Sequence, residues 1–163
     1  MEVLIREMTP ADWPAVLEIY RQGIETRNAT FQTQLPAYED WDRGHLSHCR
    51  LLALAEGIPA AWAALSPTSS RPVYRGVAEV SLYVGERFRG LGVGGRLLDA
   101  LIAASEANGI WTLQGSTFET NRASLALQQG HGFRVVGRRE RIAQLDGVWH
   151  STILTERRSP VVG

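Results

Sequence analysis

A cluster of glycines between an apolar run and a long amphipathic pattern constrains the fold of this chain more than any other feature. Residues 80–84 are VSLYV, and residues 85–95 are GERFRGLGVGG. This apolar run ends VAEVSLYV, residues 77–84, which we predict as a strand, and apolar side chains at helical spacing predict a helix over residues 92–108. A helix N-terminus leaves about four backbone N–H groups without partners. Strand, charged turn, glycines and helix therefore indicate a phosphate site, which we place on the N–H groups of residues 91–95.

Patterns on both sides of this unit predict an α/β chain. Strands before and after the central helix indicate a crossover between neighbouring parallel strands. Hairpins flank it, one joining residues 51–55 to 60–65 and one turning at Asp146-Gly147. A mixed sheet with helices on its faces follows, in a single domain of residues 1–163. The remaining predicted elements are a strand at residues 2–8, helices over residues 13–24 and 121–132, a weaker helix over residues 39–49, and a strand at residues 111–118.

Composition excludes several classes of protein. The 163 residues hold 17 Lys+Arg and 17 Asp+Glu, so the net charge of zero gives no support for a nucleic-acid partner. With one cysteine, Cys49, no internal disulfide is possible. The N-terminus lacks a signal-peptide core, and no apolar run reaches the ~18 residues of a membrane span. We expect a cytoplasmic protein.

The glycine cluster has rival interpretations. It is either a phosphate site or a plain flexible connection between strand and helix. Residues 90–95 also satisfy G-x-G-x-x-G, and Glu119 follows downstream, as in nicotinamide-dependent enzymes. In the dinucleotide-binding fold of those enzymes the glycines follow the strand directly, whereas residues 85–89 separate the strand from the glycines here. No Lys-Ser/Thr follows the last glycine, so a Walker loop is excluded.

The segment from Arg89 to Gly94, RGLGVG, resembles the R/Q-x-x-G-x-G/A signature of the GNAT superfamily of acyl-CoA N-acyltransferases. The stretches IREMTPADWPAVLEIYRQGI, NATF, AEVSLYV and NRASLALQQGHGF closely resemble its phosphinothricin N-acetyltransferase branch. The resemblance runs from Leu4 to about Leu154. It implies a GNAT-like α/β fold (an α+β mixed sheet) of about six to seven strands with helices on both faces.

The resemblance also implies acetyl-CoA as co-substrate. In the family this molecule lies in a V-shaped opening between two splayed parallel strands, here residues 80–84 and 112–118. The backbone of Leu82 and Val84 would bind its pantetheine arm, Asn121 would hold the arm with a lesser part for Ser124, and an N–H of this stretch would stabilise the oxyanion. Plain helix capping is the alternative role for Asn121. The predicted cofactor-binding set is Leu82, Tyr83, Val84, Arg89, Gly90, Leu91, Gly92, Val93, Gly94, Gly95, Asn121 and Ser124.

Acyl transfer to an amine requires a proton acceptor, because an α-amino group has a pKa of about 8 and is largely protonated at neutral pH. Glu79 interrupts an otherwise apolar strand, and the resembled branch places its proposed base there. An exposed carboxylate at the strand start is the alternative. Many superfamily members donate a proton to the leaving thiolate from a tyrosine, but the matching position appears here as Gln128, so no acid is assigned.

The branch implies a small amine acceptor, an amino acid or an analogue such as phosphinothricin or methionine sulfoximine. Its acid group would suit a guanidinium, for which Arg71 and Arg75 are candidates, and Phe31 is a candidate pocket wall. Solvated arginines and a core phenylalanine are the alternatives.

Two clusters receive no site role. His45, His48 and Cys49 lack the further ligand of a zinc site, so we expect solvated helix residues and no metal. The arginines of residues 134–141 are expected on an exposed hairpin face. The sequence thus favours an N-acetyltransferase working by direct transfer, with a non-catalytic acyl-CoA-binding module or a nicotinamide-dependent oxidoreductase as alternatives. Because relatives often pair, a homodimer is possible.

Overall fold

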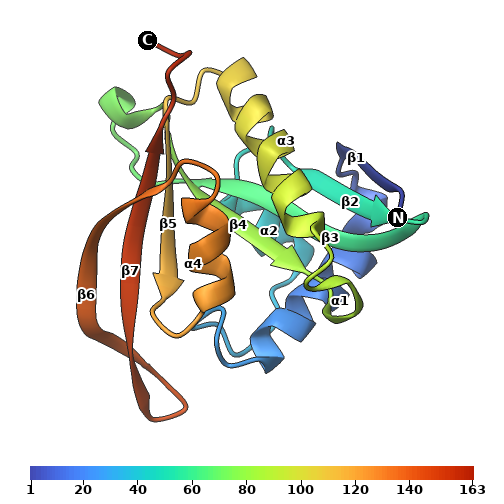
Figure 1. Cartoon of the computed structure of the whole chain (residues 1–163), viewed down its shortest axis with the longest axis horizontal. Coiled ribbons are helices and arrows are strands. Elements are labelled where there is room, and N and C mark those ends of the chain that lie inside the picture. Colours follow the sequence, from blue (N-terminus) through green and yellow to red (C-terminus); the bar gives the residue numbers. More distant parts are fainter.

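A computed structural model describes all residues, 1–163, and arranges them around one seven-stranded sheet of order β1-β2-β3-β4-β5-β7-β6 (Figure 1). The strands are β1 (Val3–Glu7), β2 (Leu51–Ala55), β3 (Ile58–Pro67), β4 (Val77–Val84), β5 (Thr112–Phe118), β6 (Arg134–Leu145) and β7 (Val148–Arg158). The α-helices are α1 (Trp13–Glu25), α2 (Tyr38–Gly44), α3 (Val93–Ala107) and α4 (Arg122–Gln129). Short 3-10 turns span Pro10–Asp12, Pro72–Tyr74 and Glu86–Phe88.

The sheet is mixed, as predicted. β4 and β5 form its one parallel pair, joined by α3, and all other neighbouring strands are antiparallel. This confirms the crossover expected from the strand–glycine–helix pattern.

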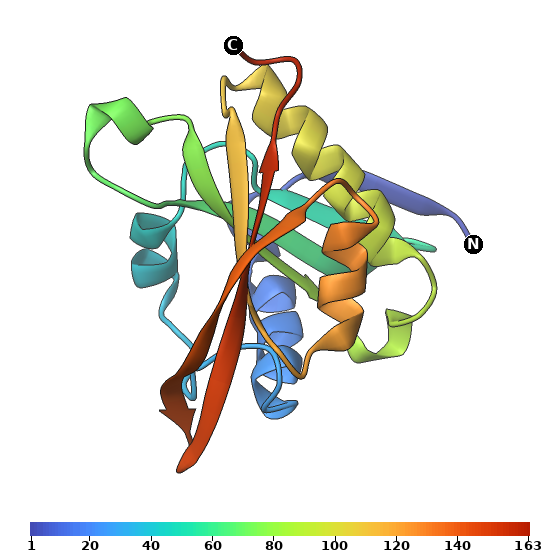
Figure 2. The ribbon, with the colours of Figure 1, turned by 60° about the vertical axis from the view of Figure 1, so that its left-hand side comes forward.

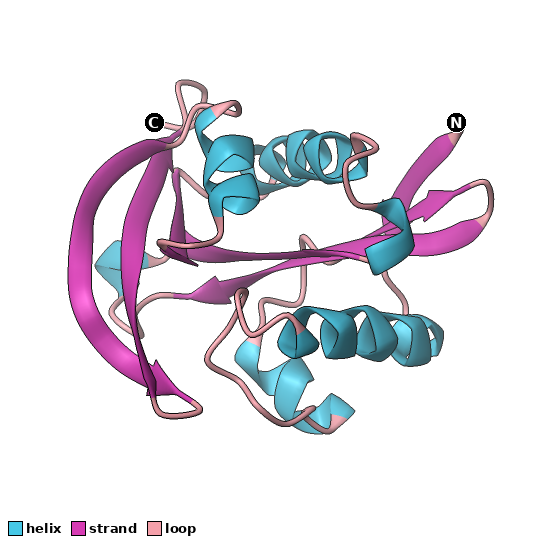
Figure 3. Cartoon of the chain, turned by 60° about the horizontal axis from the view of Figure 1, so that its bottom comes forward, coloured by secondary structure: helices cyan, strands magenta, loops and turns pink.

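Helices cover both faces of the sheet (Figure 3). Two hydrophobic clusters fill the spaces between the layers. Alternate residues of β3 pack into the clusters on opposite faces of the sheet. Ala61 and Ala63 belong to the cluster that includes Leu97 of α3, whereas Trp62 and Ala64 belong to the cluster that includes Val16 of α1. The period of two along this central strand therefore fixes which helix covers each face.

The turn of the first hairpin is shorter than predicted, whereas the second hairpin turns at Asp146-Gly147 as predicted. Glu56 and Gly57 both have positive φ, 50° and 77°, as a two-residue type I′ turn requires. β3 consequently begins at Ile58. The prediction of a start at Ala60 was wrong because Pro59 lies within the strand, opposite the register shift between Ala53 and Leu54 of β2. Asp146 and Gly147 repeat the same turn at φ values of 50° and 77°.

The weak helix predicted through Cys49 ends earlier. α2 stops at Gly44, and His45 is already extended at φ −124° and ψ 151°. Cys49 has φ 60°, which is incompatible with a continuing helix. The segment from His45 onward is instead a loop that leads into β2.

The parallel ladder between β4 and β5 is short. It comprises the pairs Val77–Thr112, Ala78–Leu113 and Glu79–Gln114. Beyond Glu79, β4 pairs with β3 alone, and beyond Gln114, β5 pairs with β7 alone. The two strands diverge from this point, as Figure 1 shows, and leave a wedge between them. In the turned view of Figure 2 they cross at an angle. No helix of this fold is both long and apolar enough to cross a membrane.

Candidate active site in the wedge between two strands

Two adjoining cavities lie along the diverging strands. The central cavity has a volume of about 500 Å³ and lies between β4, β5 and the loop of residues 29–32. The helix-end cavity has a volume of about 460 Å³ and lies beneath the first turn of α3. Six residues line both: Ala29, Leu82, Tyr83, Asn121, Ser124 and Leu127. The shared lining makes one continuous cleft from the start of α3 to the closed end of the wedge.

The helix-end cavity presents unpaired backbone donors. Gly92 caps α3 with φ 83°, and the first helical bond joins Arg96 N to Gly92 O, so the N–H groups of residues 92–95 have no helical acceptor. Gly90 also has positive φ, 75°. At Gly94 there is little room for a side chain, because an added Cβ would lie 3.3 Å from a Val84 methyl. Backbone amides at a helix N-terminus, together with the Arg89 guanidinium, form a donor set that fits a diphosphate.

Most of the predicted cofactor residues meet at this cleft. Of the twelve, all but Leu91 line one or both cavities, and the Leu91 side chain is 55% exposed. Asn121 also caps α4, since its side-chain oxygen accepts a hydrogen bond of 3.3 Å from Ser124 N. The capping role and a place in the cleft therefore coexist at Asn121.

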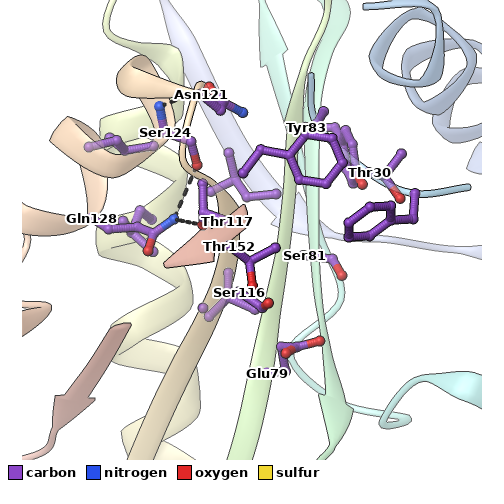
Figure 4. Close-up of a pocket in the computed structure, with 18 of the residues that line it drawn as sticks. Thr30, Glu79, Ser81, Tyr83, Ser116, Thr117, Asn121, Ser124, Gln128 and Thr152 are labelled. Atoms are coloured by element: carbon purple, nitrogen blue, oxygen red, sulfur yellow. Dashed lines mark hydrogen bonds between the residues drawn. The ribbon is translucent and has the colours of Figure 1, made fainter. Parts of the chain in front are cut away.

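Glu79 lies at the closed end of the wedge, at the last position of β4 that pairs with β5. Figure 4 shows it bordering the same gap as Ser81 and Ser116. Its carboxylate is half-buried, and burial raises its pKa above the usual value of 4.5, an effect opposed by the Gln114 side chain and by the positive charge of Arg139. A half-buried carboxyl with a raised pKa suits proton transfer near neutral pH.

Aromatic side chains wall the central cavity on two sides. Phe31 packs on Phe118 at 4.6 Å between ring centroids, and both line the cavity. On the other side the Tyr83 ring stacks on Trp62 at 5.1 Å. Burial raises the pKa of the Tyr83 hydroxyl, so this group stays neutral. The structure thus places Phe31 at the cavity wall, as the sequence led us to expect, and its packing on Phe118 gives it a structural role as well.

Gln128 occupies the position where the family often has a tyrosine, and it organises a polar network. Its amide nitrogen donates to Thr117 Oγ1 at 2.8 Å and to Ser124 Oγ at 3.1 Å (Figure 4). Thr155 Oγ1 donates to its oxygen at 2.5 Å. Thr155 is fully buried. The network holds α4 against β5 and β7, and Gln128 contributes no titratable proton to the cleft.

Arg71 and Arg75 are not brought to either cavity. The Arg71 guanidinium lies over Tyr74 at 5.6 Å and that of Arg75 lies over Trp111 at 5.5 Å. The expectation that the arginines of residues 134–141 lie on an exposed hairpin is confirmed, with Arg138 pairing with Glu119 at 2.8 Å. That ion pair engages Glu119, which lines neither cavity.

Sequence reasoning missed several cavity residues. Ser81, Ser116 and Thr152 line the central cavity, and their only sequence signal is alternation along strands whose exposed face was unknown.

His45 also lines the central cavity, so its assignment as a solvated helix residue was wrong. The His45 ring stacks on Trp41 at 4.4 Å and its Nδ1 donates to the Trp41 carbonyl at 2.7 Å. Burial lowers the pKa of His45, which keeps the ring neutral. No cluster of three or more His, Cys, Asp or Glu side chains has metal-binding geometry.

Residues 13–133 match the family described as "Acetyltransferase (GNAT) family". A Bacillus subtilis protein provisionally named phosphinothricin acetyltransferase YwnH is 38% identical over 142 residues, which are 83% of this chain and 86% of that protein. The L-methionine sulfoximine/L-methionine sulfone acetyltransferase of Pseudomonas aeruginosa is 29% identical over 155 residues, 91% of this chain and 90% of that one.

Solved structures show the same likeness. A phosphinothricin acetyltransferase of the GNAT superfamily from Sinorhizobium meliloti, crystallised in complex with AcCoA, superposes with a TM-score of 0.87 at 25% identity. The match covers 97% of this chain and 89% of that one.

Proposed function

Because the chain belongs to the GNAT acetyltransferase family, we propose that its cleft performs direct acetyl transfer to the amine of an amino-acid-like acceptor, with Glu79 as the base. The protein is an N-acetyltransferase, acetyl-CoA is its co-substrate and a small-molecule amine is its acceptor. The observation that carries the proposal is the continuity of the cleft, which joins the phosphate-binding type of helix end to a carboxylate at the closed end of the wedge.

The chemical groups along the cleft support one position for the cofactor. The diphosphate of acetyl-CoA would lie on the N–H groups of residues 92–95, with the Arg89 guanidinium adding charge. Residues 80–84 leave one backbone edge unpaired, because β5 has turned away from them. The pantetheine arm carries amides of its own, so it can satisfy these groups as an added strand would, with Asn121 opposite. Bound in this way, the acetyl group is delivered to the central cavity.

Glu79 is the residue to which we assign proton removal. The acceptor nitrogen must lose a proton before its lone pair attacks the acetyl carbon, and an α-ammonium group with a pKa of about 8 needs a base to do so. The Glu79 carboxylate accepts that proton, directly or through one water. Gln128 cannot supply an acid, and a thiol of pKa about 8.5 leaves as thiolate that takes its proton from water.

The amino-acid-like acceptor is proposed from the relatives. Phosphinothricin and L-methionine sulfoximine, which appear in their names, are both amino-acid analogues. The central cavity of about 500 Å³ has room for a molecule of this size, and Phe31 and Phe118 offer an apolar wall for its side chain.

Thiol release tests the function. The purified protein is mixed with acetyl-CoA and either L-methionine sulfone, phosphinothricin or a panel of other small amines, and free thiol is followed. Release that requires both reactants supports the proposal. Binding of acetyl-CoA with no release across the panel would indicate a non-catalytic acyl-CoA-binding module, and binding of NAD in place of CoA would indicate an oxidoreductase.

A homodimer belongs to the same proposal. The β6–β7 hairpin exposes apolar side chains, including Ile142 at 53%, Val148 at 58% and Trp149 at 49%, which suit burial against a second copy. Light scattering of the purified protein tests it, and a monomeric mass would contradict it. We propose the cytoplasm as the location, which fractionation of cells expressing a tagged chain tests.

A further inference from the structure

The central cavity has no cationic side chain of its own. Its lining contains no arginine and no lysine, and Glu79 is its one carboxylate. An amino acid carries its carboxylate one carbon away from the amine. When the amine approaches Glu79, that second carboxylate comes close to the first, and two like charges at such separations repel. An acceptor of this class therefore needs a positive charge near Glu79.

A row of paired residues leads from the cavity to one arginine. Phe118 of β5 pairs with Thr152 of β7, and Thr152 pairs with Arg139 of β6. Side chains of directly opposed residues lie on the same face, with Cβ atoms about 4.5–5.5 Å apart. Phe118 and Thr152 line the cavity, and Thr152 is only 4% exposed. Arg139 is exposed and follows Thr152 outward, so it stands at the rim of the cavity on the face that bears Glu79 and Ser81.

The Arg139 guanidinium is not engaged within the chain, unlike its neighbours. Arg134 pairs with Glu156 at 2.5 Å, Arg138 pairs with Glu119, and the Arg141 guanidinium lies over Trp149 at 5.5 Å. Arg139 has neither an ion pair nor a side-chain hydrogen bond. Its positive charge nonetheless acts on Glu79 and lowers the pKa of that carboxyl, whereas burial raises it.

We propose that Arg139 binds the α-carboxylate of the acceptor at the rim of the central cavity while the acceptor amine faces Glu79. This inference rests on the proposed function and names the feature of the substrate that the site selects. A guanidinium matches a carboxylate with two parallel N–H donors, so Arg139 fixes orientation as well as charge. The bound carboxylate also neutralises Arg139, which removes the lowering effect of that charge on the pKa of Glu79. Arg139 is a specificity-determining residue and takes no proton.

Two pairs of probes separate this role from a general loss of activity. Acetyl transfer is measured with L-methionine sulfone and with its carboxamide, which keeps the amine but lacks the carboxylate. Binding to the complex of protein and CoA is measured by calorimetry with N-acetyl-L-methionine sulfone and with its carboxamide. In R139Q, kcat/KM for the acid and affinity for the acetylated acid are expected to fall about 10- to 100-fold. Values for the two amides are expected to stay the same, and R139K is expected to restore part of the loss.

Matched variants keep the test sharp. R138Q removes an equal charge from the adjacent position on the opposite face of the sheet. R75Q removes a guanidinium that the sequence analysis named as a candidate for binding the acid group of the acceptor. Both are expected to keep the acid-to-amide ratio of the wild type. The inference is overturned if R139Q keeps that ratio, if the wild type fails to bind the acetylated acid, or if R75Q loses the preference instead. Selective binding through Arg139 without thiol release would leave the anion site standing and would contradict the proposed function.

Discussion

Glu79 of β4 and Gln114 of β5 form the last rung of the parallel ladder in this sheet. The strands separate immediately beyond the pair, so the half-buried Glu79 carboxylate lies where backbone pairing ends and the cleft begins. The short ladder thus accounts for the free backbone edge of β4 beside the Glu79 carboxylate.

The first prediction concerns the base. E79Q is expected to lower turnover about 10²- to 10⁴-fold, because it removes the group that accepts the proton of the amine. In the wild type, kcat/KM falls as the pH falls through the pKa of Glu79. Because burial raises that pKa, the acidic limb should lie above pH 4.5, and E79Q should lose it. Thiol release measured across pH checks both points.

The affinity of E79Q for acetyl-CoA should equal that of the wild type, since Glu79 does not line the helix-end cavity. E119Q is the control, because Glu119 is an exposed carboxylate paired with Arg138. Equal turnover of E79Q and wild type at every pH would remove Glu79 from the mechanism.

The second prediction separates cofactor binding from helix stability. Gly92 and Gly109 flank the two ends of α3 with φ values of 83° and 77°, and an added Cβ meets no atom at either. Alanine at either position is therefore expected to cost about 1–2 kcal/mol of stability through backbone strain alone. Only G92A should also weaken acetyl-CoA binding, measured by calorimetry. Equal affinities of the two variants would place the diphosphate elsewhere.

The third prediction tests the polar network of α4. Q128L leaves the buried Thr155 hydroxyl without its acceptor and should lower the free energy of unfolding by about 1–3 kcal/mol. Q129L, at the exposed neighbouring position, is expected to change it by less than about 0.5 kcal/mol. Urea denaturation measures both. Similar midpoints for the two variants would show that the network adds no stability.

The fourth prediction concerns the support of Tyr83. An added Cβ at Gly23 of α1 would lie 2.6 Å from the Tyr83 ring, which stacks on Trp62. G23A is expected to destabilise the protein by about 1–3 kcal/mol through overpacking, despite the better helix propensity of alanine. G44A, where the added Cβ meets no atom, should not lower stability. Thermal unfolding compares the two, and an unchanged G23A would mean that the ring can shift freely.

Local patterns were enough to predict much of the architecture. β4 was predicted at its observed bounds within VAEVSLYV, and α3 within one residue at each end, because both have strong periodicity and a glycine boundary. The glycines that require positive φ or close packing, Gly92 and Gly94, are also visible in the sequence. The helix expected through Cys49 was wrong, since Leu46 N donates a hydrogen bond of 2.8 Å to Leu65 O of β3, a tertiary contact that outweighs a weak local propensity.

By itself, then, the sequence determined the order of strands and helices, the glycine-rich start of α3 and the candidacy of Glu79, because each is encoded by neighbouring residues. Only the tertiary structure decided where the parallel ladder ends and that His45, Ser116 and Thr152 line the cavity. It also decided that Arg139 pairs with the cavity-lining Thr152, whereas Arg71 and Arg75 lie away from both cavities. These features depend on which residues of distant strands pair with one another. That register is set by packing across the whole sheet, and a pattern within one strand does not contain it.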